Sequence, residues 1–119
     1  MSNDEGQWIA QLRKGMLELC MLALLSCGER YGYQIAQGLT ETAGLAVGEG
    51  TIYPLLSRLR REGLVEAQWR ESPAGPPRKY YHLTPAGRQA FETQASAWKD
   101  ITQAVYAILE EARNGKSTG

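Results

Sequence analysis

The segment from residue 84 to residue 113 limits the fold most, because nothing in it interrupts a helix. Thr84 and Pro85 predict where this helix begins, since a threonine hydroxyl caps a first turn and proline is tolerated at the first helical position. About 28 residues at 1.5 Å each make a rod of roughly 42 Å. The rest of a 119-residue chain cannot cover such a rod along its whole length. We therefore expect the helix to pack against a copy of itself.

Apolar residues on this helix predict the face that makes the contact. Phe91, Trp98, Val105 and Ala112 recur every seven residues, and Leu109 belongs to a second, less regular row. Such a repeat is typical of a coiled-coil seam. Trp8, near the start of the chain, precedes the densest apolar stretch of the first helix and could pack on the same partner. The residues expected at the dimer interface are Trp8, Phe91, Trp98, Ile101, Val105, Ile108 and Leu109.

Three shorter helices are predicted before the long one. Apolar residues recur at three- and four-residue steps from Trp8 to Ser26, from about residue 31 to 42, and from about residue 51 to 62. Gly28 and Gly63 are the expected stops, with Glu29-Arg30 as a short turn. Residues 1–7 are expected to form a flexible lead and residues 114–119 a flexible tail.

The third of these helices contains a proline that restricts its start. Proline is tolerated only in a first turn, so Pro54 predicts an N-cap at Thr51. The free N–H groups of Ile52 and Tyr53, with the Thr51 hydroxyl, would then form a small anion-binding end. Ile52, Leu55, Leu56 and Leu59 share the predicted buried face, and Tyr53, Ser57, Arg58 and Arg61 lie on the other side.

A hairpin follows the third helix. Val65, Ala67 and Trp69 alternate with polar residues, which is the periodicity of a strand. Residues 72–77 contain three prolines and predict the turn, and residues 78–83 predict the returning strand. Trp69 is expected to have a structural role beneath the hairpin.

This order of elements predicts a mainly α fold with a small two-stranded β wing. Three helices, a wing and a long helix are the order of a winged helix-turn-helix with a C-terminal dimerisation helix. We assign residues 8–83 to the DNA-binding domain and residues 84–113 to the dimerisation helix.

Residue types that enzymes and metal sites require are scarce. Cys20 and Cys27 lie in an apolar helical pattern outside any CxxC pair, and His82 is the one histidine. They predict neither a zinc site nor an activated thiol. The chain also lacks a Gly-rich phosphate loop, an HExxH motif and a serine elbow. We expect no catalysis, no metal and no cofactor.

Charge and hydropathy indicate the compartment and the kind of partner. Thirteen Lys/Arg balance thirteen Asp/Glu, which argues against a nonspecific polycation. From Arg58 to Arg88, however, seven basic residues accompany three acidic ones. That polarity suits one nucleic-acid face, or an ordinary solvated surface. No apolar run approaches the roughly 18 residues of a membrane span, and the acidic start differs from a secretory signal. We expect a cytoplasmic protein without membrane contact.

The predicted fold indicates how double-stranded DNA would be bound. In a winged helix-turn-helix the third helix enters the major groove and the wing lies along the backbone. Base edges would be read by Tyr53, Ser57 and Arg58, although each could equally contact only the backbone. The candidate DNA contacts are Tyr33, Thr51, Tyr53, Ser57, Arg58, Arg61, Arg78 and Lys79. A winged helix that contacts only proteins is the competing interpretation.

Three motifs in this order resemble the PadR family of bacterial transcriptional regulators: Tyr31-Gly32-Tyr33, the run from Gly50 to Leu64, and the run from Arg78 to Gly87. The single C-terminal helix is similar to that of the compact, LmrR-like branch. The resemblance implies a homodimeric repressor on a palindromic operator, released by a small planar aromatic or drug-like molecule. It also implies that Trp98 lines a ligand site at the dimer axis, a role that overlaps with plain packing between subunits.

Overall fold

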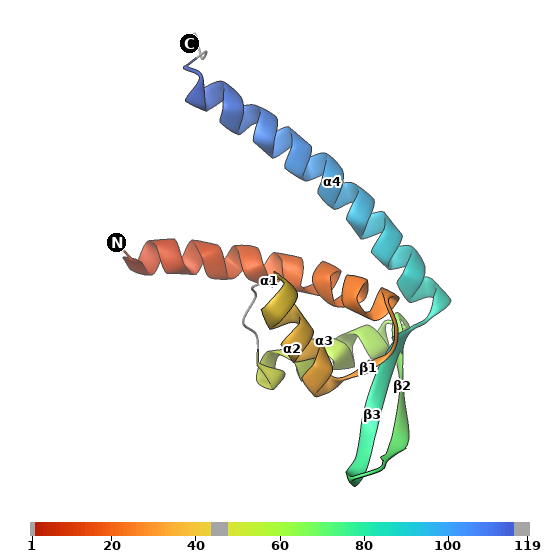
Figure 1. The fold of residues 1–119 in the computed structure, drawn as a ribbon. Coiled ribbons are helices and arrows are strands. Elements are labelled where there is room, and N and C mark those ends of the chain that lie inside the picture. Colours follow the sequence, from red (N-terminus) through yellow and green to blue (C-terminus); the bar gives the residue numbers. More distant parts are fainter. Residues whose placement is uncertain (1, 44–47, 116–119) are drawn as a thin grey trace.

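The computed structural model describes residues 2–43 and 48–115, and Figure 1 shows its elements. A body of three helices and a hairpin precedes a long helix that leaves the body at an angle to α1. The elements are α1 Ser2–Ser26, β1 Arg30–Tyr31, α2 Gly32–Ala43, α3 Glu49–Arg61, β2 Val65–Ser72, β3 Gly75–Leu83 and α4 Pro85–Arg113. This order confirms the prediction of a mainly α winged helix-turn-helix with a long last helix.

The hydrophobic core lies where the second half of α1 meets α2, α3 and the sheet. Each fully buried leucine or isoleucine contributes about 1.5–3 kcal/mol of stability. The core therefore fixes which face α3 presents to solvent. Its buried side chains are Leu17, Met21, Leu22 and Leu25 of α1, Ile35 and Leu39 of α2, Ile52, Leu56 and Leu59 of α3, and Val65, Tyr81 and Leu83 of the sheet.

Two helices begin earlier than predicted. α1 starts at Ser2 and not at Trp8, so helix occupies most of the expected flexible lead. α3 starts at Glu49 with Gly48 as N-cap, so the predicted cap at Thr51 is wrong. The backbone N–H groups of Thr51 and Ile52 both donate to the Gly48 carbonyl, at 3.1 and 3.2 Å. The Ile52 N–H is thus not available to an anion, and Tyr53 lies beyond the first turn of the helix, so the predicted anion-binding end is wrong as well.

The first turn of α3 forms ahead of Pro54. A proline cannot donate to the carbonyl four residues earlier, here that of Gly50, and its ring crowds that carbonyl. The turn before Pro54 closes on Gly48 without that bond. The proline therefore lies inside the helix and does not mark its first turn.

The C-terminal end of α3 agrees with the prediction that Gly63 stops it. Gly63 has a φ of 78°, a left-handed conformation that suits glycine. Its N–H donates to the Arg60 carbonyl at 3.0 Å, and the Leu64 N–H donates to the Leu59 carbonyl at 2.9 Å. This pair of bonds is a Schellman motif, which satisfies the last carbonyls of the helix.

The sheet has one strand more than predicted. β1 pairs antiparallel with β3, giving the strand order β1-β3-β2, where a short turn at Glu29-Arg30 was expected. A two-residue strand shows no alternation, so only its pairing identifies it. The hairpin turn is also shorter than the predicted residues 72–77, because Ser72 pairs with Gly75. Pro76 and Pro77 belong to β3, at the outer end of the hairpin.

α4 begins where the sequence predicts. The Thr84 hydroxyl accepts the Gly87 N–H at 3.0 Å and donates to the Gly63 carbonyl at 2.6 Å, which ties the helix start to the end of α3. Phe91 packs against the core of its own chain. Past Ala95 most residues of α4 are exposed. Residues 116–119 of the expected tail lie outside the described residues. None of the helices described has both the length and the apolar character needed to cross a membrane.

Candidate nucleic-acid interface

A groove of about 470 Å³ separates α3 from the hairpin. Aromatic rings form much of its wall, and two cations lie along the hairpin side. α3 and the hairpin both present side chains to it, as the winged helix-turn-helix prediction requires. Its lining residues are Tyr31, Gly32, Tyr53, Ser57, Trp69, Pro77, Arg78, Lys79 and Tyr81.

Tyr53 is one of the two α3 residues that line the groove. Its ring lies against the backbone of Gly32, where an added Cβ would come within 2.6 Å of the ring carbon Cζ. The Tyr53 ring of α3 therefore occupies the space that a side chain at Gly32 would need. Burial, with a smaller contribution from the charge of Glu49, raises the pKa of Tyr53. The Tyr53 hydroxyl consequently stays protonated and able to donate a hydrogen bond.

Ser57, Arg60 and Arg61 line a second, shallower hollow on the exposed side of α3. Arg61 and Ser57 were predicted contacts, whereas Arg60 was missed. Arg60 follows Tyr53 by seven residues, so both lie on one side of the helix. That spacing could have identified it.

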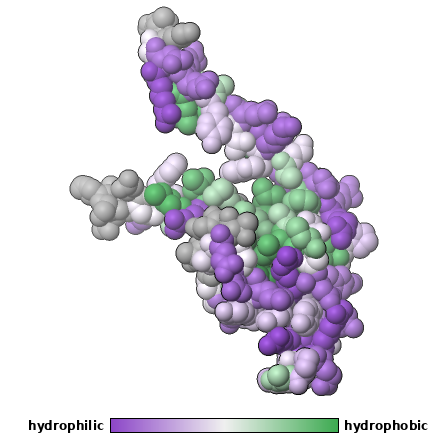
Figure 2. All heavy atoms as spheres, viewed as in Figure 1, coloured by the Kyte–Doolittle hydropathy of each residue, from purple (hydrophilic) through white to green (hydrophobic). Residues whose placement is uncertain are grey.

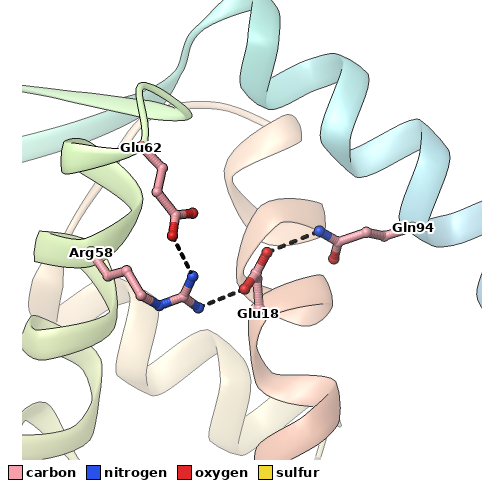
Figure 3. Close-up of polar contacts among 4 residues, drawn as sticks. All are labelled: Glu18, Arg58, Glu62 and Gln94. Carbon is pink, nitrogen blue, oxygen red and sulfur yellow. Dashed lines mark hydrogen bonds and ion pairs between the residues drawn. The ribbon is translucent and has the colours of Figure 1, made fainter.

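Arg58 points away from this surface, toward α1. Its guanidinium donates to the Glu18 carboxylate at 2.6 Å and to the Glu62 carboxylate at 2.9 Å (Figure 3). This placement differs from the prediction that Arg58 reads a base edge. The reason is a partner 40 residues away in sequence, which helical periodicity cannot reveal.

The hairpin face that looks toward α3 carries Trp69 and Lys79, which are cross-strand partners. The Lys79 ammonium lies 5.7 Å from the centre of the Trp69 ring. Trp69 is 65% exposed, so the prediction that it supports the hairpin from beneath is wrong. Exposed tryptophans are enriched at protein interfaces, so this pair adds to the candidate surface. Sequence alternation placed Trp69 on the inner face, and the length of the hairpin carries it beyond the core.

Arg70 and Arg78, which pair across the two strands of the hairpin, both lie over aromatic rings, and Arg78 also lines the groove. The Arg78 guanidinium lies 4.4 Å from the centre of the Tyr31 ring, and that of Arg70 lies 5.3 Å from the centre of the Tyr80 ring. Arg70 also pairs with Glu29, its Nη2 donating to Oε1 at 2.9 Å. These contacts brace the wing against the body.

The structure thus gathers five of the eight predicted DNA contacts. Tyr53, Ser57, Arg78 and Lys79 line the groove, and Arg61 lies beside it. Tyr33 is exposed on α2 and Thr51 is exposed on α3, outside the groove lining.

A second candidate surface lies on the two helical arms, α1 and α4. Figure 2 shows apolar atoms exposed along both arms. Trp98 is 39% exposed, and the apolar residues that follow it on α4 are more exposed still. Uncovered apolar rows of this extent mark an interaction site. The exposed residues are Trp8, Ile9 and Leu12 on α1 and Trp98, Ile101, Val105, Tyr106, Ile108 and Leu109 on α4.

The model of the PadR-like family of transcriptional regulators matches residues 21–93, which include most of the core, the groove and the first turns of α4. The chain belongs to the PadR-like family. A PadR-like regulator from Bacillus cereus is 39% identical, with a TM-score of 0.77 over 83% of this chain and 96% of that one. A PadR family regulator from Eggerthella lenta superposes with a TM-score of 0.81 at 28% identity, over 92% and 95% of the two chains.

A further solved structure holds PadR from Bacillus subtilis in complex with operator DNA. It is 29% identical, with a TM-score of 0.62, and the match covers 67% of this chain and 45% of that longer one. These relatives are transcriptional regulators and not enzymes. The PadR-like chain described here is accordingly a transcriptional regulator with a winged helix fold.

Proposed function

We propose that this PadR-like protein is a homodimeric repressor that binds a palindromic operator through α3 and the β2–β3 wing. The groove between α3 and the wing carries the proposal, because it places reading and backbone-binding side chains on one concave surface. The solved complex of Bacillus subtilis PadR with operator DNA supports this use of the fold.

The side chains divide by what each can recognise. Ser57, Arg60 and Arg61 project from the exposed side of α3 and would meet base edges in the major groove. Lys79 on the wing would contact a phosphate, which positions the protein but carries no sequence information. Tyr53 belongs to α3 but lines the same groove as Lys79, so it lies between the base-reading and the phosphate-binding side chains.

A second subunit would cover the apolar rows of α1 and α4. Two reading helices must lie about 34–36 Å apart to meet successive major grooves. A dimer joined along α4 would fix that separation, and its twofold symmetry would match a palindrome.

Trp98 is the proposed contact for a small planar aromatic effector at the dimer axis. Its planar indole is exposed on the uncovered face of α4, so in a dimer joined along that face two symmetry-related indoles could enclose a flat ligand. A ligand that prefers one spacing of the reading helices shifts the dimer toward it by its differential affinity alone. In a Trp8→Phe/Trp69→Phe background, quenching by a planar ligand reports Trp98 directly. Quenching without a change in operator affinity would contradict the switch.

DNA binding is tested with a site selected by this protein from a randomised duplex library. We expect retained preference for that site over random DNA and a steep loss of affinity with added salt. Lys79→Ala should weaken both kinds of DNA alike and reduce the salt slope by about 1. Lys99→Ala, a charge removal on an exposed part of α4, is the matched control and should leave the slope unchanged. Absence of any preferred sequence would favour the competing role in protein contacts.

A further inference from the structure

One carboxylate, that of Glu18, joins the recognition helix to the long C-terminal helix. Glu18 lies on α1, with 26% of its side chain exposed. One of its oxygens accepts the Arg58 guanidinium of α3 at 2.6 Å, and the other accepts the Gln94 amide of α4 at 2.9 Å. Figure 3 shows the carboxylate between the two partners, with Glu62 on the far side of Arg58.

The position of Gln94 on α4 gives the contact its importance. It lies between Phe91, which packs against the core, and Trp98, which stands on the uncovered face. Gln94 is therefore close to the point where α4 leaves the body. A rotation of the outer part of α4 about that point would act on the Gln94 amide before it acted on the core.

The carboxylates around Arg58 explain why its side chain stays beside α1. Two carboxylates, of Glu18 and Glu62, face one guanidinium. Burial alone would raise the pKa of Glu18, but the hydrogen bonds from Arg58 and Gln94 outweigh it and hold that pKa below its ordinary value. Glu18 is thus ionised at neutral pH, and both of its oxygens are engaged by charged or strongly polar donors. Both hydrogen bonds are made to the one carboxylate of Glu18, so a movement of Arg58 or of Gln94 would strain the bond to the other.

We propose that Glu18 is a positioning residue, which transmits the direction of α4 to α3 through Gln94 and Arg58 and so sets the distance between the two reading helices of the dimer. This inference rests on the proposed function, since it presumes that α4 joins the subunits and α3 reads DNA. It adds a residue that belongs neither to the groove lining nor to the exposed apolar rows of α1 and α4.

The first experiment measures how strictly the dimer holds its half-site spacing. The full-length protein is titrated with its selected palindromic site and with the same half-sites moved apart by one base pair. The wild type should bind the altered spacing at least about tenfold more weakly, as a rigid dimer requires. Glu18→Gln should reduce that ratio at least about threefold. A merely structural role would lower the folded fraction and weaken binding to both duplexes by the same factor, leaving the ratio unchanged; that result would overturn the inference.

The second experiment tests whether the two arms of the contact are coupled. Arg58→Met and Gln94→Leu are measured singly and together, each against the selected site. Arg58 and Gln94 share Glu18, so their effects on operator affinity should deviate from additivity by about threefold or more. The deviation should vanish in a Glu18→Ala background. Gln89→Leu, on an exposed turn of α4, is the matched control and should be additive with Arg58→Met.

The outcomes separate the inference from the proposed function. A wild type that shows no preferred sequence or sediments as a monomer would refute the proposed function. A wild type that binds its site with a strict spacing, beside additive Arg58 and Gln94 variants, would refute only the role of Glu18. Thermal unfolding of each variant corrects the affinities for any loss of folded protein.

Discussion

The contact between Gly32 and Tyr53 predicts a specific effect of adding one methyl group. In Gly32→Ala the new Cβ would lie 2.6 Å from Cζ and 2.7 Å from Cε1 of Tyr53, which no real pair of carbons tolerates. The overlapping atoms are at the far end of a side chain, so the ring would swing away from α2. Tyr53 would then leave the groove, and the fold would lose part of its covered surface.

The size of the loss follows from how much of Tyr53 is covered. With 42% of Tyr53 exposed, roughly 100 Å² of the residue is shielded from water. Losing all of this cover would cost about 2.5 kcal/mol at about 25 cal/mol per Å². If the ring loses only its contact with Gly32, roughly half of the covered area becomes exposed, which costs about 1 kcal/mol. For a domain of this size we expect the melting temperature to fall by about 4 °C.

Thermal unfolding followed by circular dichroism tests this prediction, and operator affinity should fall in the same variant. Gly50→Ala is the control, because an added Cβ there meets nothing within 4 Å. It should raise stability by up to about 1 kcal/mol, since alanine favours a helix. In a Tyr53→Ala background Gly32→Ala should cost nothing further. An equal loss in both backgrounds would show that the ring is not the obstacle, and the reasoning would fail.

Three other predictions concern the start of α4, the dimer face and the Glu18 carboxylate. Gly87→Ala should destabilise the protein by about 1–3 kcal/mol, because its Cβ would overlap the backbone carbonyl of Leu64; an unchanged melting temperature would contradict this packing. Val105→Asp should lower the dimer population in sedimentation, and a persistent dimer would mean that α4 packs by another face. The pKa of Glu18 is lowered on folding, so its contribution is complete above the ordinary value of 4.5 and is lost as the pH falls below it. Glu18→Gln should therefore lose less stability than the wild type between about pH 5 and pH 3 in urea unfolding.

Local signals predicted the frame of the molecule well. The start of α4 at Thr84-Pro85 and the end of α3 at Gly63 depend on residues within a few positions, and both are confirmed. Periodicity likewise predicted the buried face of α3, because a helix repeats its contacts every few residues. The order of these elements was sufficient to predict the winged helix fold.

Features that depend on distant residues were not predictable in the same way. β1 exists because Arg30 and Tyr31 pair with Tyr81 and Tyr80, some 50 residues along the chain. The start of α3 at Glu49 was missed because proline was expected only in a first turn. The bond that Pro54 cannot donate is one bond, and a full turn of helix forms before it. Trp69 followed the alternation of a buried strand face, and only the reach of the hairpin past the core exposes it.

The positive charge available at the candidate interface depends on which basic side chains already form ion pairs with carboxylates. In the part of the chain that the structure describes, Arg58 and Arg70 are the arginine or lysine residues of α3 and the wing that form ion pairs with carboxylates. Arg58 is thereby neutralised, and Arg70 braces the wing. The cations that remain for DNA are therefore Arg60 and Arg61 of α3 with Arg78 and Lys79 of the wing.

This distribution allows a chain of zero net charge to bind a polyanion. The carboxylates of Glu18 on α1 and of Glu62 at the end of α3 hold Arg58 on the inner side of α3, where it positions the helix. The outer side of α3, with Arg60 and Arg61, stays basic. Removing Lys79 should lower the salt slope, because a phosphate contact releases a counterion from DNA. Removing Arg58 should alter affinity without lowering that slope, because its charge is already balanced within the protein. A lowered slope for Arg58→Met would mean that DNA draws the guanidinium away from Glu18, and would place Arg58 among the phosphate contacts.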